Sequence, residues 1–376
     1  MLLIKNIFKE NCNSQNRGPC YKMLNKVIAE LVDEKGLDQA SLQSVICEGI
    51  LAAYSKKYPE AILRVFVNKK SESIAVEVEK TVVATVENPA TELSLKKAQA
   101  MQTSLSLGDK VWMSFEEPIG RVEILKARQV IAAKLKDIEA LSVYEAFKDK
   151  LGHIVQGVVH KHEQNGTLVM LRDTLAFLPR SLSIPTETYI AGRPIRALLK
   201  TVHQEHRSTG QLILDRSSGE FLARLLELEI PEIYDKLIEV KAVARRAGYK
   251  SKVIVAQNDP NIDPVGTCIG VGGGRIKPIL KELDGEKIDV FSWGNSKEEL
   301  VALALRPAEV NKVEILDDKR ARAWVSEDQR ALAIGKLGQN IGLASELLGL
   351  EIELVSSGHG LEDAGLGSQD SSESKF

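Results

Sequence analysis

The amino-acid sequence predicts an elongated α+β protein made of several small domains, and three observations carry this prediction. Five short β-rich segments follow one another between Gly152 and Ser217. A pattern containing Gly-x-x-Gly occurs twice in the last third of the chain. Residues 121–150 contain neither Gly nor Pro, so a helix there would span roughly 45 Å and connect two domains. A chain of 376 residues has room for two or three domains, or for more small ones.

The overall charge excludes a polycation that binds nucleic acid by bulk charge. The formal net charge is −2 and the pI is about 6.4, so any nucleic-acid binding has to come from local geometry. The 4 cysteines form no Cys-x-x-Cys pair and no His stands at zinc-ligand spacing, so we expect no metal and no cofactor. Reduced thiols, together with the lack of a signal-peptide core or a membrane-length apolar segment, favour a cytoplasmic protein without membrane contact.

The first 150 residues predict a flexible extension followed by an α/β domain. Residues 1–20 contain only short apolar pieces, which suits an extension. From Tyr21 onward apolar residues recur at helical spacing, and later segments alternate as strands do. We therefore place an N-terminal domain at 21–150. Its expected elements are helices from Tyr21 to Gly36 and after Asp38, a hairpin of strands at 63–67 and 74–79, a helix at 94–101, a strand at 108–115 and the long linker helix at 121–150.

Residues 151–219 predict a five-stranded OB-fold barrel. Five β segments within seventy residues suggest a small barrel of the OB type. The segments are HIVQGVVHK (153–161), GTLVML (166–171), LAFLP (175–179), PIRALLKTV (194–202) and GQLILDR (210–216).

The last third of the chain contains an internal repeat. Ile269–Val290 resembles Ile334–Val355 at an offset of 65 residues, and both copies share Ile-Gly-x-x-Gly-x-x-Ile. Each copy predicts a strand, a helix, the Gly-x-x-Gly loop, a second helix and a second strand. We assign the copies to domains at 220–294 and 295–356. Residues 357–376 are too polar and too rich in Gly and Ser to fold alone, and we expect a disordered tail.

The glycine-rich stretch CIGVGGGRIK (268–277) favours contact with a nucleic-acid backbone. It does not fit a Rossmann fingerprint, because Arg275 stands where the third Gly belongs, and it lacks the Gly-Lys-Ser/Thr ending of a Walker loop. In a KH domain, the Gly-x-x-Gly loop lets the backbone approach about four single-stranded nucleotides without a Cβ clash. A lone copy also suits an ordinary helix connection, but two copies with matching flanks favour RNA.

Longer motifs resemble one family, the bacterial NusA transcription factors. The resemblance covers about residues 21–356. It is weaker in the OB barrel, which looks like the family's ribosomal-protein-S-one-type domain, and in the N-terminal domain. The motifs that carry it are Ile230-Pro231-Glu232-Ile233, Arg245 with Lys250 and Lys252, Asp263-Pro264-Val265-Gly266, Gly285-Glu286-Lys287-Ile288-Asp289-Val290 with Trp293, and Ala333 to Asn340 with Leu343-Ala344; the weaker ones are Phe177-Leu178-Pro179, Glu187-Thr188-Tyr189, Gly108-Asp109-Lys110-Val111 and Gly120-Arg121.

The resemblance implies a fold of two tandem prokaryotic-type KH domains and a non-enzymatic elongation factor. Such a factor binds core RNA polymerase, nascent single-stranded RNA and other antitermination (Nus) factors, as a monomer, and modulates pausing, intrinsic termination and antitermination. Two alternatives stay open at this point. One is a ribosome-associated RNA chaperone without polymerase contact; the other is an RNA-degrading phosphorylase, although residues 21–150 show no catalytic acidic or phosphate-binding core.

The loops depart from the family pattern in ways that predict weak RNA binding. The variable pair of the first loop is Val271-Gly272, without the basic residue that family members often carry. Residues 236–357 hold 18 Lys and Arg against 18 Asp and Glu, so we expect shape-guided binding with little salt dependence. The candidate RNA-binding residues are Gly270, Val271, Gly272, Gly273, Arg275, Lys277, Gly335, Lys336, Leu337, Gly338, Gln339, Asn340, Arg245, Lys250, Lys252 and Phe177, and the candidate polymerase-binding residues are Arg121, Lys126 and Arg128.

Overall fold

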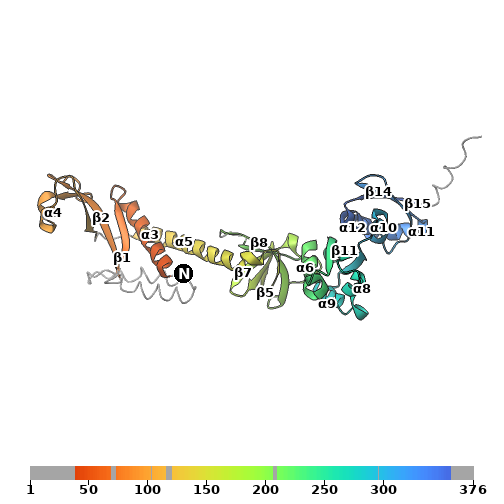
Figure 1. Cartoon of the computed structure of the whole chain (residues 1–376). Helices are drawn as coiled ribbons and strands as arrows, with labels where there is room; N and C mark the ends of the chain where they lie inside the picture. Colours follow the sequence, from red (N-terminus) through yellow and green to blue (C-terminus); the bar gives the residue numbers. More distant parts are fainter. Residues whose placement is uncertain are drawn as a thin grey trace, which may run out of the picture. The chain divides into compact units, whose positions relative to one another are not determined.

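The computed structural model describes residues 39–68, 73–102, 104–115, 121–205, 210–294 and 296–356 (Figure 1). The chain divides into two compact units, residues 1–142 and 143–376, and each is taken by itself below. The mixed α+β fold class predicted from the sequence is confirmed. The predictions of an extension, of a helix between Tyr21 and Gly36 and of a disordered tail fall outside the described residues.

In the first unit, helix α3 (Gln39–Lys57) packs on a sheet of four strands. Leu42 and Ile46 of α3 are buried against Ile74 and Val76 of the sheet, because apolar side chains alternate to one face of each strand. The predicted hairpin is confirmed as an antiparallel pair of β1 and β2. The elements are β1 (Leu63–Asn68), β2 (Ser73–Val83), β3 (Glu92–Ser94), α4 (Leu95–Met101) and β4 (Lys110–Ser114).

The long helix predicted at 121–150 is α5 (Arg121–Phe147), which ends in a 3-10 turn, η2 (Lys148–Lys150). In the first unit α5 lies close to α3, since a Cβ on Gly49 would overlap the side chain of Ile131. The last turn of α5 belongs to the second unit, where Phe147 is buried in the core of the barrel.

The second unit begins with the predicted five-stranded barrel, which is closed in the order β5-β6-β7-β9-β8. Neighbouring strands are antiparallel except β7 and β9, which are parallel. Inward-facing side chains such as Val169, Leu178 and Leu199 fill the interior. The strands are β5 (Ile154–Glu163), β6 (Gly166–Leu171), β7 (Thr174–Pro179), β8 (Pro194–Val202) and β9 (Leu212–Asp215), with a 3-10 turn, η3 (Arg180–Leu182), after β7.

Two domains of identical topology follow the barrel, as the internal repeat predicts. In each, a helix leads to an antiparallel strand pair, then two helices joined by the glycine loop, then a strand parallel to the middle one. The first consists of α6 (Gly219–Glu229), α7 (Pro231–Tyr234), β10 (Ile238–Arg246), β11 (Lys250–Gln257), α8 (Pro264–Ile269), η4 (Val271–Gly273), α9 (Ile276–Glu282) and β12 (Lys287–Ser292). The second consists of α10 (Lys297–Ala304), β13 (Val310–Ile315), β14 (Arg320–Val325), α11 (Glu327–Ile334), η5 (Lys336–Gly338), α12 (Gln339–Leu348) and β15 (Glu351–Ser356).

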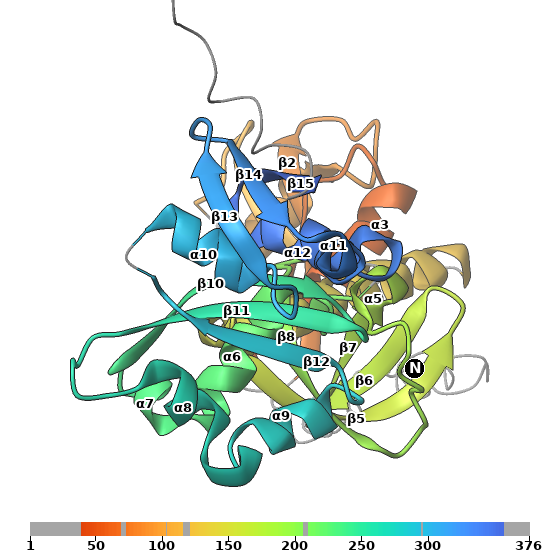
Figure 2. The same cartoon turned by 90° about the vertical axis from the view of Figure 1, so that its right-hand side faces the viewer.

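Shared hydrophobic cores join the three modules of the second unit. Phe221 of α6 lies in one cluster with Leu198 of the barrel. On the other face of the β10-β11-β12 sheet, Phe291 packs with Val301 and Leu343 of the second repeat domain, and α12 runs along β10 and β11 (Figure 2). The two glycine loops therefore sit on one packed block.

The described residues contain no helix with the length and apolarity that crossing a membrane requires. The same residues contain no group of three or more His, Cys, Asp or Glu side chains arranged to hold a metal ion.

Candidate nucleic-acid interface

Two loops of the same conformation carry the Gly-x-x-Gly pattern. One joins α8 to α9 and the other joins α11 to α12. The first glycines, Gly270 and Gly335, both have φ 72°, with ψ 167° and 176°, a region essentially restricted to glycine. The last glycines, Gly273 and Gly338, have φ 76° and 73°. The backbone therefore requires glycine at the first position of each loop and favours it at the last.

An exposed apolar side chain stands at the tip of each loop, and the second tip also carries the exposed Lys336. Val271 is 101% exposed and Leu337 is 88% exposed. Leu337 has φ 54°, a left-handed conformation that costs a non-glycine residue roughly 1–2 kcal/mol, whereas the equivalent Gly272 adopts φ 60° freely. The first loop tip carries no charged side chain, so its backbone is its main binding group.

Open space lies beside the last glycine of each loop. A Cβ on Gly338 would meet nothing within 4 Å, and one on Gly273 would meet only Lys277 and Ile276, at 3.5 Å or more. The exposed side chains of Lys277 and Lys336 stand at these loops. Their ammonium groups can reach a phosphate lying against the glycines.

Two residues at the loops that the sequence predicts to bind RNA, Arg275 and Asn340, form hydrogen bonds to other groups of the protein. Arg275 donates from Nη1 to Glu232 Oε2 at 2.7 Å and to the Thr267 carbonyl at 3.1 Å. Asn340 is only 6% exposed, so the predicted contact of its amide with RNA is corrected. Its Nδ2 donates to the carbonyls of Leu305, Leu332 and Ala333 at 3.0, 3.3 and 3.2 Å. Beside it, Gln339 is half-buried, and its Oε1 has no hydrogen-bond partner in the described part of the chain.

The basic run on β10 and β11 is also turned inward, and its predicted RNA contact is wrong for two residues. Arg245 is 1% exposed at its side chain and forms a two-pronged ion pair with the buried Glu286 carboxylate. Lys252 is fully buried and bonds Asp289 at 3.3 Å. Lys250, which is largely buried, pairs with the same carboxylate at 2.6 Å. These ion pairs join β10 and β11 to β12 and to the turn before it.

The environment of Lys252 disfavours its charged form. Burial lowers the pKa of Lys252 to about 8, the Asp289 carboxylate opposes this shift, and the Lys250 ammonium adds to it. The Lys252 ammonium also donates to the Arg306 carbonyl at 3.1 Å, which lies in the second repeat domain. Lys252 thus connects the two repeat domains by a hydrogen bond.

Phe177, the predicted barrel residue, faces outward from β7. Its neighbours along the strand, Ala176 and Leu178, are buried. The ring lies over Gly166, where a Cβ would come within 2.8 Å of Cζ. Leu168 and Ile213 are its cross-strand partners, and with Phe177 they form an apolar outer stripe. Sequence reasoning missed Leu168 and Ile213, because only the register across three strands places them beside the ring.

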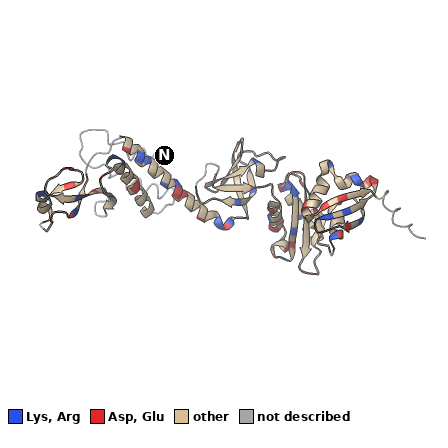
Figure 3. Ribbon diagram, turned by 90° about the horizontal axis from the view of Figure 1, so that it is seen from above, with Lys and Arg blue, Asp and Glu red and all other residues tan. Residues whose placement is uncertain are grey.

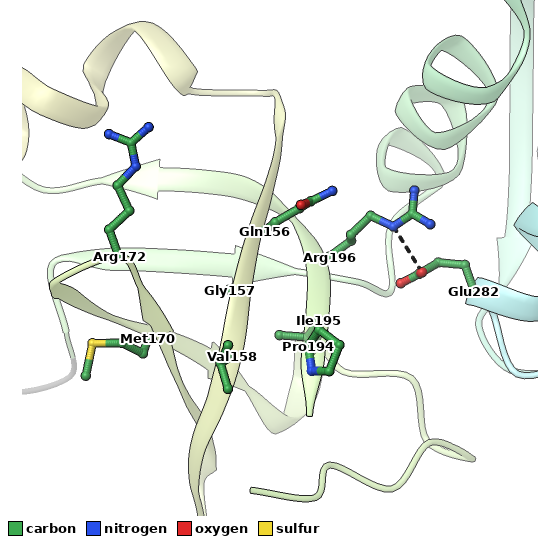
Figure 4. Close-up of a pocket in the computed structure, with 9 residues that line it drawn as sticks. All are labelled: Gln156, Gly157, Val158, Met170, Arg172, Pro194, Ile195, Arg196 and Glu282. Carbon is green, nitrogen blue, oxygen red and sulfur yellow. Dashed lines mark hydrogen bonds and ion pairs between the residues drawn. The ribbon is translucent and has the colours of Figure 1, made fainter. Parts of the chain in front are cut away.

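A cavity of about 590 Å³ lies between the outer face of β5, β6 and β8 and the end of α9 (Figure 4). Arg196 in this cavity donates to Glu282 at 3.1 Å and to Glu229 at 2.9 Å, so its charge is compensated. Arg172 stands at the opposite side of the cavity from Arg196. Polar groups do not converge there as they do in a built ligand site, and we assign it no ligand.

The candidate polymerase-binding residues lie in the first two turns of α5. Lys126 is exposed and Arg128 is partly exposed, with the buried Ala127 between them. Arg121 begins the helix, and its side chain lies outside the described residues.

Comparisons with known proteins agree with this architecture. The model for the NusA N-terminal domain matches residues 24–140, and those for the NusA-like first and second KH domains match residues 216–293 and 297–361. The transcription termination/antitermination protein NusA of Thermus thermophilus is 35% identical over 343 residues, which is 87% of this chain and 88% of that protein. The chain belongs to the NusA family. The NusA protein of Bacillus subtilis is 34% identical over 329 residues, again 87% of this chain and 88% of the relative.

Both glycine loops fall within the segments that match the NusA KH models. Among solved structures, the N-terminal domain of NusA from Bacillus subtilis aligns with 30% of this chain and 92% of its own length, at 26% identity and a TM-score of 0.23.

Proposed function

We propose that this protein is a transcription elongation factor that binds nascent RNA and core RNA polymerase and acts in pausing, intrinsic termination and antitermination. The observation that carries the proposal is the pair of identical glycine loops, each with open space at its last glycine, in two matched NusA-like KH domains. The relatives in Thermus and Bacillus bear the name transcription termination/antitermination protein.

RNA is held mainly by backbone and shape in this proposal. Gly270 to Gly273 and Gly335 to Gly338 meet the sugar–phosphate chain, Lys277 and Lys336 supply the nearest cations, and Phe177 stacks a base on the barrel. Residues coloured as Lys and Arg are interspersed with Asp and Glu in the second unit (Figure 3). Several weak sites on one block raise the effective concentration of RNA at each further site.

The remaining parts of the proposal concern partners and organisation. The first unit docks on polymerase, with Arg121, Lys126 and Arg128 as candidate contacts, and other antitermination factors join the complex. The protein acts as a cytoplasmic monomer without enzymatic activity, metal or cofactor. We propose domains at 21–150, 151–219, 220–294 and 295–356, with the last turn of α5 packed into the barrel.

The first test is association of the purified chain with core RNA polymerase, with and without a nascent transcript, for wild type and Gly338→Asp. A Cβ at 338 would meet nothing within 4 Å, and the Asp carboxylate would add a repelling charge where RNA is proposed to bind. We expect polymerase binding to survive and the transcript-dependent gain to disappear. Gly349→Asp is the matched control, because Gly349 has φ 66° and equally open surroundings at the other end of α12. Failure of the wild-type chain to bind polymerase would contradict the proposal.

A further inference from the structure

We infer that Arg275 and Asn340 are positioning residues that hold the two glycine loops through hydrogen bonds to other parts of the protein and do not contact RNA. The inference rests on the proposed RNA-binding function of these loops. The two residues are equivalent in the repeat, since they lie 65 positions apart like the glycines. They differ in chemistry, one a charged guanidinium and the other a neutral amide, yet they make the same two kinds of contact.

The first contact is to the end of the helix before the loop. Arg275 Nη1 donates to the Thr267 carbonyl at 3.1 Å, and Asn340 Nδ2 donates to the Leu332 carbonyl at 3.3 Å. Thr267 and Leu332 are themselves equivalent positions, three residues before the first glycine. Carbonyls in the last turn of a helix lack partners within the helix, so an outside donor fixes the point where the chain leaves it.

The second contact is to the segment between the first helix and the first strand of the same domain. Arg275 pairs with Glu232 of α7 at 2.7 Å, and Asn340 donates to the carbonyl of Leu305, the residue that ends α10, at 3.0 Å. Each loop is thereby tied to a part of its domain that is distant in sequence. A loop held at two points keeps its shape before RNA arrives, which lowers the conformational entropy lost on binding.

The first glycine of each loop packs closely against the backbone and the first side-chain atoms of the positioning residue. A Cβ on Gly270 would lie 3.0 Å from Arg275 Cγ, and a Cβ on Gly335 would lie 2.7 Å from Asn340 Cβ. Real Cβ atoms do not tolerate the second distance and rarely the first. The first glycine is therefore needed for close packing inside the protein, whereas the open surroundings of Gly273 and Gly338 leave the last glycine to the ligand.

The substitution Glu232→Gln distinguishes a positioning role of Arg275 from direct contact with RNA, because the two roles predict opposite changes in RNA affinity. If Arg275 touches RNA, loss of the competing carboxylate frees the guanidinium and strengthens binding. If Arg275 positions the loop, the loop loosens and binding weakens, by about twofold to fivefold for a half-exposed ion pair. Glu227→Gln is the matched control, because this substitution removes the same charge from a partly exposed ion pair, that of Glu227 on α6 with Arg224.

The full-length chain is to be measured with a mixed-sequence single-stranded RNA oligonucleotide and, in parallel, by amide hydrogen exchange without RNA. We expect Glu232→Gln to weaken RNA binding and to speed exchange of the amides from Gly270 to Arg275. Unchanged or tighter RNA binding would overturn the inference. If the wild-type chain does not bind the RNA at all, the proposed function fails, and exchange alone decides: unchanged exchange rates overturn the positioning role and faster ones support it.

Asn340→Asp gives an independent test in the second loop. The change keeps the size of the side chain and replaces the donor with a carboxylate that faces three carbonyl oxygens. We expect faster exchange from Gly335 to Gly338 and unchanged exchange in the first loop, which serves as the control within the same molecule. Unaltered exchange in the second loop would contradict the role of Asn340.

Discussion

At the scale of single residues, the two loops adopt the same left-handed backbone conformation with different residues. Gly272 and Leu337 occupy equivalent left-handed positions, with φ 60° and 54°. Leu337 is 88% exposed, so its side chain gains little from packing and its strained backbone has no compensation there. Strained, exposed positions of this kind are found at functional sites, where the side chain serves a ligand.

Leu337→Gly is expected to stabilise the second unit by about 0.5 kcal/mol, because relief of backbone strain exceeds the added flexibility of the unfolded chain. The reciprocal Gly272→Leu should destabilise it by about 1 kcal/mol. Urea unfolding of the two variants checks the pair. If both substitutions changed the free energy of unfolding in the same direction, backbone strain at this position would differ between the two domains, which would contradict the prediction.

Lys252 predicts a pH dependence of stability. Its folded-state pKa of about 8 lies below the ordinary lysine pKa of 10.5, chiefly because the side chain is buried. Between these values the unfolded chain binds more protons than the folded one, so the free energy of unfolding rises with pH, by up to about 3 kcal/mol. The charged groups facing Lys252 are Asp289, which favours its ammonium form, and Lys250, which opposes it.

The measurement is urea unfolding at several pH values between about 8 and about 10, for wild type and Lys252→Met. The difference between the two proteins isolates Lys252 from cysteine and tyrosine groups that titrate in the same range. We expect the free energy of unfolding of the wild type to rise with pH relative to that of Lys252→Met. A difference that stays constant across this range would contradict the assignment.

At the scale of elements, the sequence predicts helices, strands and loops well and the exposure of charges poorly. Strand alternation and the repeat depend on neighbours in sequence, so they can be read directly from it. The burial of Arg245 depends on Glu286, 41 residues away, and that of Lys252 on Asp289, 37 residues away. From the sequence alone, the basic run resembles an exposed RNA-binding segment. The pairing of β11 with β12 places the two carboxylates beside it, and this pairing cannot be seen in the local sequence.

A buried arginine, Arg216, forms ion pairs across the joint between the barrel and the first KH domain, in addition to the shared hydrophobic core. Arg216 is 1% exposed and pairs with Glu187 of the barrel at 2.7 Å and with Glu282 of α9 at 2.8 Å. Arg216→Met should destabilise the second unit by about 2 to 3 kcal/mol, since it removes the buried cation that pairs with Glu187 and leaves Glu282 with Arg196 alone. Arg224→Met, which removes an exposed pair with Glu227, is the control and should cost at most about 1 kcal/mol. Equal effects in thermal unfolding would show that the joint does not depend on Arg216.

At the scale of the whole molecule, RNA affinity is expected to depend little on salt. The chain has a formal net charge of −2, and the two KH domains carry no excess of positive charge. A strong salt dependence requires many phosphate contacts from Lys and Arg. The exposed cations at the loops described above are few, so shape and backbone contacts have to supply most of the affinity. A measured slope that corresponds to eight or more phosphates would be incompatible with this description.

Val271→Lys tests the same point by adding the charge that the first loop lacks. Val271 is fully exposed at the loop tip, so the substitution disturbs no packing. One new phosphate contact should tighten binding of single-stranded RNA at low salt and steepen the plot of log affinity against log salt by roughly 0.7. Ile62→Lys adds an equal charge at a 58% exposed position in the first unit, outside both glycine loops, and should change neither quantity. If both variants steepened the slope alike, the attraction would follow net charge and not the loop. Steepening by Val271→Lys alone would place a phosphate at the tip of the first glycine loop.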